Sequence, residues 1–140
     1  MDRIELGDIN YFAVLVSVII PMVLGALWYS PMLFAKQWMS ASGFSPEKMK
    51  NKSAITKGYI ISIAGSILFA MAMAITAQLM GLDGASDGIF LGLLGLVGLV
   101  APAFASAFAF EQRPMSLYFI YVGYQLVNFI LVGLVIVLWQ

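Results

Sequence analysis

Four apolar stretches, each about as long as a membrane-spanning helix, constrain this chain more than any other feature. They cover about residues 10–29, 58–80, 88–110 and 115–139, and none of them contains Asp, Glu, Lys or Arg. A helix needs about 20 apolar residues to cross a hydrocarbon core of about 30 Å. We therefore expect an all-α, polytopic membrane protein, with one transmembrane domain over residues 1–140 and its four helices arranged as two hairpins.

The composition agrees with lipid as the solvent for most of the chain. Hydrophobic residues make up 62% of the sequence and charged residues 10%, whereas soluble domains average about 45–50% and about 25%. A soluble domain of 140 residues has too little interior to bury so much apolar surface. The first ten residues are acidic and no small-x-small cleavage site follows at a suitable distance, so we expect no cleaved signal peptide.

Two residue types are missing from the sequence, which contains neither Cys nor His. Disulfides, thiolate or imidazole metal sites, and Cys or His nucleophile–base pairs are therefore excluded. We expect no metal and no cofactor. The net charge is zero, so electrostatics give no reason to expect a nucleic-acid partner.

The distribution of Lys and Arg predicts how the chain is threaded. Residues 30–57, the longest polar stretch, and the turn after residue 110 together contain Lys36, Lys48, Lys50, Lys52, Lys57 and Arg113, whereas the other side holds only Arg3. The positive-inside rule places the basic loops in the cytoplasm and both termini outside. This bias is too strong for dual topology, and we expect a multi-pass protein of the cell (cytoplasmic or inner) membrane.

The loop over residues 30–57 contains two further patterns. Apolar side chains around Lys36 are typical of a segment that lies in the headgroup region. Ser45, Pro46 and Glu47 are typical of the start of a helix, as N-cap, first helical residue and first-turn acid. The lysines at 48–57 favour a solvated face beside the membrane over the sharper alternative, a specific site for anionic lipid.

Prolines and small residues predict how the helices pack. Pro21 lies in the middle of the first stretch, where we expect a structural kink rather than a functional hinge. In the third stretch, small residues recur at steps of three, four or seven: Gly88, Gly92, Gly95, Pro102, Ala105 and Ala109. This spacing stacks them on one face, where another backbone can approach closely. We expect the third helix to make the closest helix–helix contact.

A family resemblance is carried by Gly25-Ala-Leu-Trp-Tyr-Ser-Pro31, with Phe34, Lys36 and Trp38-Met39 after it. Here the chain resembles a family of small four-helix integral membrane proteins that is catalogued only as a domain of unknown function. The resemblance extends over essentially the whole chain, through Gly92-Leu-Leu-Gly, Ala101-Pro102, Phe110-Glu-Gln-Arg-Pro114, Gly123-Tyr124, Gly133 and Leu138-Trp139. It implies a four-helix membrane fold and no activity. Ala35 departs from it, because glycine is common there in the family.

Two groups of polar residues are candidate binding sites. Tyr121, Gln125 and Asn128 follow an i, i+4, i+7 spacing that stacks them on one face of the last helix. Amide groups facing lipid would be unsatisfied, so the face must meet other helices or a wet cavity. We favour contacts between helices over a lumen or ligand site.

The second group lies near the basic face of the membrane and consists of Trp28, Tyr29, Lys36, Glu111 and Arg113. It could form a polar cluster that binds a ligand. Aromatic residues at a membrane interface and charged residues in a tight turn are common without such a role. We favour that plainer interpretation.

These patterns leave three classes of function. No ionisable group lies well inside a span, which argues against proton-coupled antiport, and no base lies near a nucleophile, so we do not expect an enzyme. The small-residue face favours a structural or accessory protein that acts through helix–helix association, in a homo-oligomer or a larger membrane complex. The alternatives are a small oligomeric channel or facilitator for a small solute, and a lipid-binding membrane protein. Membrane lipids are expected partners in any case.

Overall fold

The structure, a computed structural model, describes residues 4–140. It contains four helices that are long and apolar enough to cross a membrane. They are α1 (Tyr11–Trp28), α3 (Lys52–Met80), the segment Ala85–Phe110, and α6 (Met115–Leu138). No strand occurs within the described residues. The expected all-α, multi-pass membrane fold is confirmed. Arg3, on which part of the orientation rests, lies outside the described residues, so the orientation stays a prediction.

The polar segment between the first two spans contains more helix than expected. A short helix, α2 (Ala35–Ser42), covers the region around Lys36, and Gly43 follows its last residue with a φ of 72°, a value that favours glycine. Ser45 and Pro46 precede only a 3-10 helix, η2 (Lys48–Lys50), rather than the start of an α-helix.

The second span begins at Lys52 and not near residue 58. Asn51 sets this start, because its side chain accepts a hydrogen bond from the backbone N–H of Ala54 at 3.1 Å. Lys52 and Lys57 are therefore helical. Long lysine side chains can reach the headgroup region from a helix end, so their charge does not require a loop.

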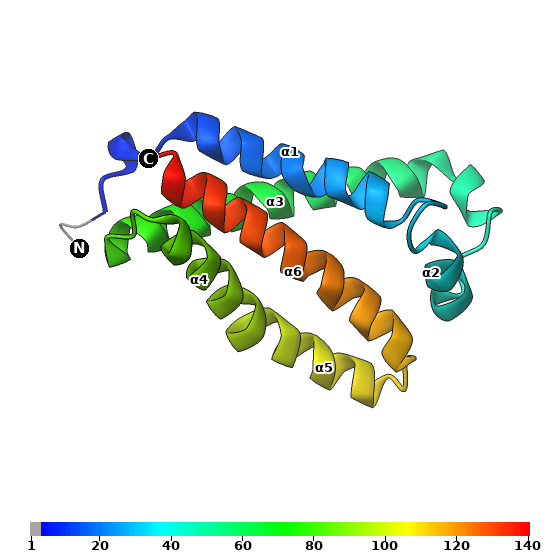
Figure 1. The fold of residues 1–140 in the computed structure, drawn as a ribbon. Coiled ribbons are helices and arrows are strands. Elements are labelled where there is room, and N and C mark those ends of the chain that lie inside the picture. The colour runs from blue at the N-terminus through cyan, green and yellow to red at the C-terminus, as the bar shows by residue number, and fades with distance from the viewer. Residues whose placement is uncertain (1–3) are drawn as a thin grey trace.

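Pro102 lies where the third span changes its helical geometry. This span consists of α4 (Ala85–Gly95), a π-helical turn η3 (Leu96–Val100) and α5 (Ala101–Phe110). Proline lacks an N–H group and its ring crowds the carbonyl four residues earlier, here that of Gly98. The wider π-helical turn accommodates this mismatch, and the chain changes direction between α4 and α5 (Figure 1). Pro21, by contrast, lies buried within the continuous helix α1.

The best-packed part of the bundle lies at the end where the described chain begins and ends, which we call the terminal end (Figure 1). Here α1, α3, α4 and α6 share one core, whose most buried members are Ala13, Ala70, Ala77 and Val132, each at most 1% exposed. Small side chains on α1 and α3 bring these helices close to α6. This end therefore resembles the interior of an ordinary helix bundle.

Glycines make the closest approach in the bundle, between α4 and α6. A Cβ atom on Gly92 would lie 2.5 Å from the backbone oxygen of Phe129, and one on Gly88 would lie 2.8 Å from that of Gly133. Gly133 in turn lies against the backbone oxygen of Gly88. Gly95 meets only the ring of Phe129, at 3.2 Å. We call Gly88, Gly92 and Gly133 the glycine contact. It explains how two backbones can touch inside the bundle.

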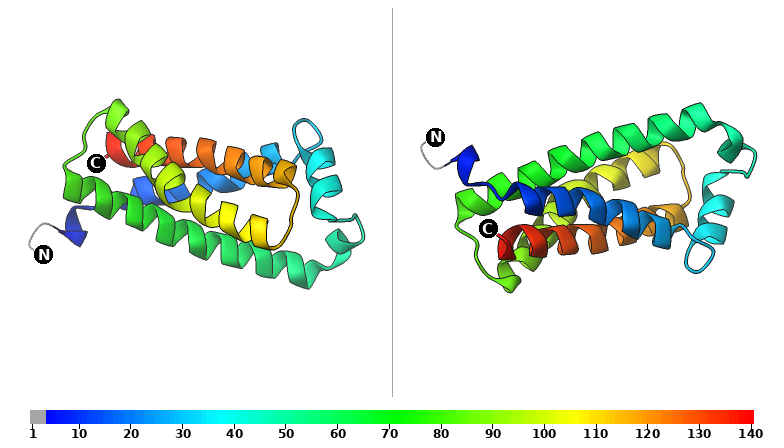
Figure 2. Two further views of the ribbon diagram at one scale, coloured as in Figure 1. Left: turned by 90° about the horizontal axis from the view of Figure 1, so that it is seen from below. Right: turned by 90° about the horizontal axis from the view of Figure 1, so that it is seen from above.

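Packing becomes looser toward the opposite end, which carries α2 and the turn before α6 and which we call the loop end. The buried residues of α3 all lie between Ala70 and Ala77, and α5 buries only Phe108. Figure 2 shows α1 and α6 side by side, with α3 diverging from them toward α2. The helices therefore separate as they approach the loop end.

Candidate functional site

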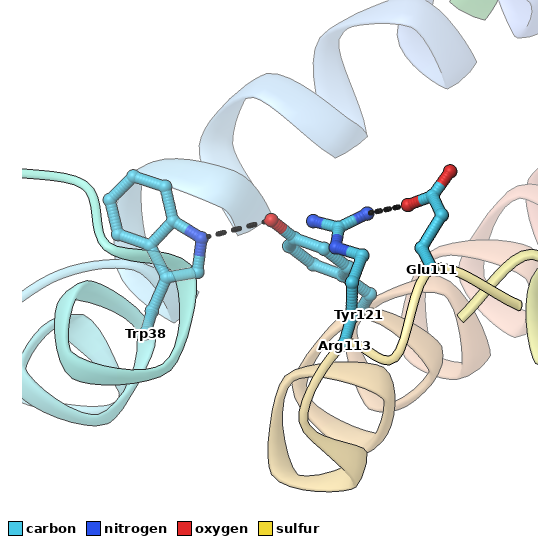
Figure 3. A network of polar contacts seen from close by, with 4 residues as sticks. All are labelled: Trp38, Glu111, Arg113 and Tyr121. Carbon is cyan, nitrogen blue, oxygen red and sulfur yellow. Dashed lines mark hydrogen bonds and ion pairs between the residues drawn. The ribbon is translucent and has the colours of Figure 1, made fainter. Parts of the chain in front are cut away.

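Aromatic side chains tie α2 to the bundle at the loop end. The indole Nε1 of Trp38, on α2, donates a hydrogen bond to the hydroxyl of Tyr121, on α6, at 3.2 Å (Figure 3). Tyr29, just after α1, stacks at 5.3 Å from Trp38 and 5.6 Å from Tyr124, measured between ring centroids. Trp28 donates to the backbone oxygen of Ile120 at 3.1 Å. Trp28, Tyr29 and Trp38 therefore hold α1, α2 and α6 together.

Arg113 and Glu111 lie beside this group, in the turn between α5 and α6 (Figure 3). Their ion pair is 3.6 Å long and both side chains are well exposed, so it contributes under about 1 kcal/mol. The guanidinium of Arg113 also lies 4.4 Å from the ring centre of Phe108, a cation–π contact. Lys36 is exposed, and its ammonium forms no ion pair within residues 4–140. Arg113 and Glu111 therefore stabilise the turn, and Lys36 takes no part in these contacts.

Two adjoining cavities occupy the loop-end half of the bundle, where the helices diverge. The midspan cavity, of about 530 Å³, lies between α3, η3, α5 and α6. The loop-end cavity, of about 600 Å³, lies between α1, α2, α3 and α6. Pro21, Ser62 and Tyr124 line both. Each volume falls within the range of about 300–1,000 Å³ that is typical of ligand pockets.

The midspan cavity reaches the surface of the molecule between α3 and α5. Leu99 and Phe104 line it and are 73% and 37% exposed. Both belong to a span that crosses the membrane. In a bilayer, the opening therefore faces acyl chains rather than water.

The polar residues predicted on α6 separate into two groups. Tyr121 belongs to the aromatic group at the loop end, whereas Gln125 and Asn128 line the midspan cavity. The amide nitrogen of Asn128 donates to the side-chain oxygen of Gln125 at 3.3 Å, within the same helix. Asn128 is 4% exposed, and its side-chain oxygen has no hydrogen-bond partner. A buried carbonyl oxygen without a partner destabilises the fold, so a ligand that donates a hydrogen bond to it would stabilise the protein.

Sequence reasoning did not assign several residues that line the cavities. Ser62 and Ser66 contribute hydroxyl groups from α3, Gly65 lies between them, and Tyr124 donates a hydrogen bond from its hydroxyl to the backbone oxygen of Pro21 at 2.7 Å. The i, i+4 spacing of the serines indicates that they share one helix face. This face is polar but uncharged, unlike the start of α3, which carries lysines. That signal was available in the sequence, but it does not reveal which helix the face meets.

Charge is missing from the lining of both cavities. Within the described residues, none that lines the midspan or the loop-end cavity is acidic or basic. Aromatic and sulfur-containing side chains dominate the loop-end cavity, for example Trp38, Tyr59 and Met49. The arrangement therefore suits an uncharged or weakly polar molecule.

Comparison with known proteins gives a family and no activity. Residues 12–137 match the model of a family described as "Protein of unknown function (DUF1761)". No curated protein and no solved structure matches the chain.

Proposed function

The chain belongs to the DUF1761 family of proteins of unknown function, and we propose that it is a membrane protein that binds a lipid-like molecule within its own helix bundle. The observation that carries this proposal is the pair of adjoining cavities in the loop-end half, together with the unpartnered oxygen of Asn128. The side-chain oxygen of Asn128 supports the proposal because a buried polar atom without a partner costs free energy, which a bound ligand that donates a hydrogen bond would offset.

The glycine contact bears on the alternative role, an accessory protein that acts through helix–helix association. In the sequence, Gly88 and Gly92 supported that role because they offer a surface for a close partner. In the fold, α6 of the same chain covers them. The glycine face is thus occupied within the bundle and no longer supports binding to another protein.

The surroundings of both cavities favour a membrane lipid as the bound molecule. The midspan opening faces acyl chains, as Leu99 and Phe104 indicate. At the loop end, α2 carries Trp38 and an exposed Lys36. Apolar and basic side chains together are typical of helices in the headgroup region. A lipid could therefore reach the site from within its own leaflet.

Filling the midspan cavity tests the proposal directly. Gly65 lines the cavity, and a Cβ atom at this position would have no atom within 4 Å. Gly65→Phe should place its ring in the open space and displace a bound lipid, with little effect on folding. Gly58 is the matched control, because it is also an exposed glycine of α3 with open space around it, but it lines neither cavity.

The measurement is native mass spectrometry of the detergent-purified protein, with co-purified lipid counted for each variant. We expect lipid on the parent and on Gly58→Phe, and at least a several-fold loss on Gly65→Phe. Equal lipid retention by the two variants would contradict the proposal. So would a parent that retains no lipid and binds no added single-chain amphiphile.

A further inference from the structure

The polar lining of the midspan cavity points to the kind of lipid that it would hold. Five side chains with hydrogen-bonding groups line this space. The hydroxyl of Tyr124 already donates to the backbone oxygen of Pro21, and the other four are Ser62 and Ser66 on α3, and Gln125 and Asn128 on α6. Around them the lining is apolar, with Phe69, Leu99 and Phe104 among its members. A narrow polar patch inside an apolar cavity fixes the orientation of a ligand.

The absence of charge limits the polar part of that lipid. No acidic or basic residue, within the described chain, lines this cavity or the one that adjoins it. A phosphate or a carboxylate buried there would lose its hydration and gain no counter-ion, at a cost of several kcal/mol or more. Within residues 4–140 the basic side chains, such as Lys36 and Arg113, instead lie at the loop end, outside the polar patch.

Asn128 supplies the most specific requirement. Its amide nitrogen is already engaged with Gln125, whereas its carbonyl oxygen accepts no hydrogen bond. A carbonyl oxygen needs a donor, and an ester or a ketone has none to give. The oxygen is enclosed by protein atoms, so the side chain must turn toward the cavity to meet a ligand. That turn breaks only one long hydrogen bond, at 3.3 Å, in which the amide nitrogen is the donor, and the oxygen gains a hydrogen bond in exchange.

From these observations we propose that the midspan cavity binds an uncharged lipid that carries a hydroxyl group, with this hydroxyl donating to the side-chain oxygen of Asn128. The hydroxyls of Ser62 and Ser66 lie on the facing helix and suit a second oxygen of the same ligand, such as that of an ester. Acyl chains then extend past Leu99 and Phe104 into the bilayer. This inference rests on the proposed function, because it specifies the ligand of the same site.

Three single-chain lipids with one acyl chain in common separate the possibilities. Monooleoylglycerol is uncharged and carries hydroxyls, methyl oleate is uncharged and has none, and oleoyl lysophosphatidate adds a charged phosphate. Their affinities for the detergent-solubilised full chain are measured by ligand-induced thermal shift and by native mass spectrometry. We expect monooleoylglycerol to bind roughly three- to tenfold more tightly than methyl oleate, which is the factor that one hydrogen bond provides, and lysophosphatidate to bind most weakly.

Asn128→Leu tests whether the preference for monooleoylglycerol depends on the side chain of Asn128. The variant should still bind methyl oleate but should lose the preference for monooleoylglycerol. Ser106→Ala is the control, because Ser106 is an exposed hydroxyl on α5 that lines neither cavity, and it should keep the preference. The comparison of the three lipids on the parent protein is informative even if Asn128→Leu fails to fold.

Each other outcome overturns a defined part of the argument. Equal binding of the two uncharged lipids, still blocked by Gly65→Phe, would remove the hydroxyl requirement and keep the lipid site. Tightest binding of lysophosphatidate would overturn the assignment of an uncharged ligand. A preference that persists in Asn128→Leu would overturn the role of Asn128. Failure of all three lipids to bind would overturn the proposed function itself, and would leave water as the occupant of the polar patch.

Discussion

The same four spans pack in two different ways at the two ends of the molecule. At the terminal end, Gly92 and Gly133 bring α4 and α6 into backbone contact, and alanines such as Ala70 and Ala77 bring α3 close to α6. At the loop end, α3 presents serines and a glycine to open space instead. The comparison shows that small side chains alone do not close a membrane bundle. They close it only where a second helix supplies a complementary surface.

The geometry of the third span explains where the change occurs. The π-helical turn η3 and Pro102 redirect the chain between α4 and α5, so that α5 departs from the direction set by the glycine contact. Lipid packing provides no hydrophobic force that would pull the separated helices together again. A redirected span can therefore leave a stable cavity in a membrane bundle, and the four predictions that follow test this difference between the ends.

The largest expected effect is an all-or-none difference in chemical labelling between the two ends. The bias of basic residues predicts that the terminal end faces outward and the loop end the cytoplasm. A single cysteine in place of Asp83 should react with an impermeant thiol reagent added to intact cells, and one in place of Ser53 should react only after permeabilisation. The reverse pattern would refute the predicted orientation while leaving the fold intact.

Gly92→Leu should produce the largest loss of stability. Its Cβ atom would lie 2.5 Å from the backbone oxygen of Phe129, and a backbone cannot give way as a side chain can. Overpacking typically costs about 1–3 kcal/mol, and we expect the upper part of that range in thermal unfolding in detergent. Gly98→Leu is the control within the same span, because its nearest neighbour would be a flexible side-chain atom of Leu94 at 3.9 Å. Equal melting temperatures for the two variants would mean that the glycine contact is not rigid.

A smaller and more local effect is expected from Tyr121→Phe. The change removes the hydroxyl that accepts the hydrogen bond from Trp38, at a cost of about 0.5–1.5 kcal/mol. Because the bond joins α2 to α6, amide hydrogen exchange should become faster over residues 35–42 and should stay unchanged at the glycine contact. Exchange that accelerates equally at both ends would show that the two regions unfold as one unit.

The smallest effect on stability is expected from Asn128→Leu in the ligand-free protein. The variant loses one long hydrogen bond within α6 and also removes a buried oxygen that has no partner. Replacing an unsatisfied polar group by an apolar one can be nearly neutral, so we expect a change of less than about 1 kcal/mol in either direction. A loss as large as that of Gly92→Leu would indicate that Asn128 is a structural member of the bundle.

The sequence predicted the spans well because charge is excluded from hydrocarbon, and this exclusion leaves a clear pattern in residues 58–80 and 115–139. It did not predict the true start of α3, since Lys52 and Lys57 interrupt the apolar pattern although a helix end in the headgroup region tolerates them. Ser45 and Pro46 form a common helix-start pattern, but here the side chain of Asn51 provides the cap that begins the span.

The candidate site was harder to predict because a helix face does not identify its neighbour. The spacing of Gln125 and Asn128 required a polar or enclosed environment, and the structure places both beside a cavity. The spacing of Gly88 and Gly92 required a close partner, and nothing in the pattern distinguishes α6 of the same chain from a helix of another. The divergence of α3 and the turn at η3 depend on packing across the whole bundle, which no local pattern encodes.

The central position of α6 also affects how the protein is made. The core at the terminal end joins residues of α6 to residues of α1 and α3, as Val132 and Ile136 do with Ala13 and Ala70. During synthesis α1 enters the membrane first and α6 last, so the early helices wait in the bilayer without their main partner. Membrane insertion of single helices precedes their association. Assembly of this bundle is therefore completed only after synthesis of its last span, and interruption before Met115 would leave inserted helices for quality-control proteases to recognise.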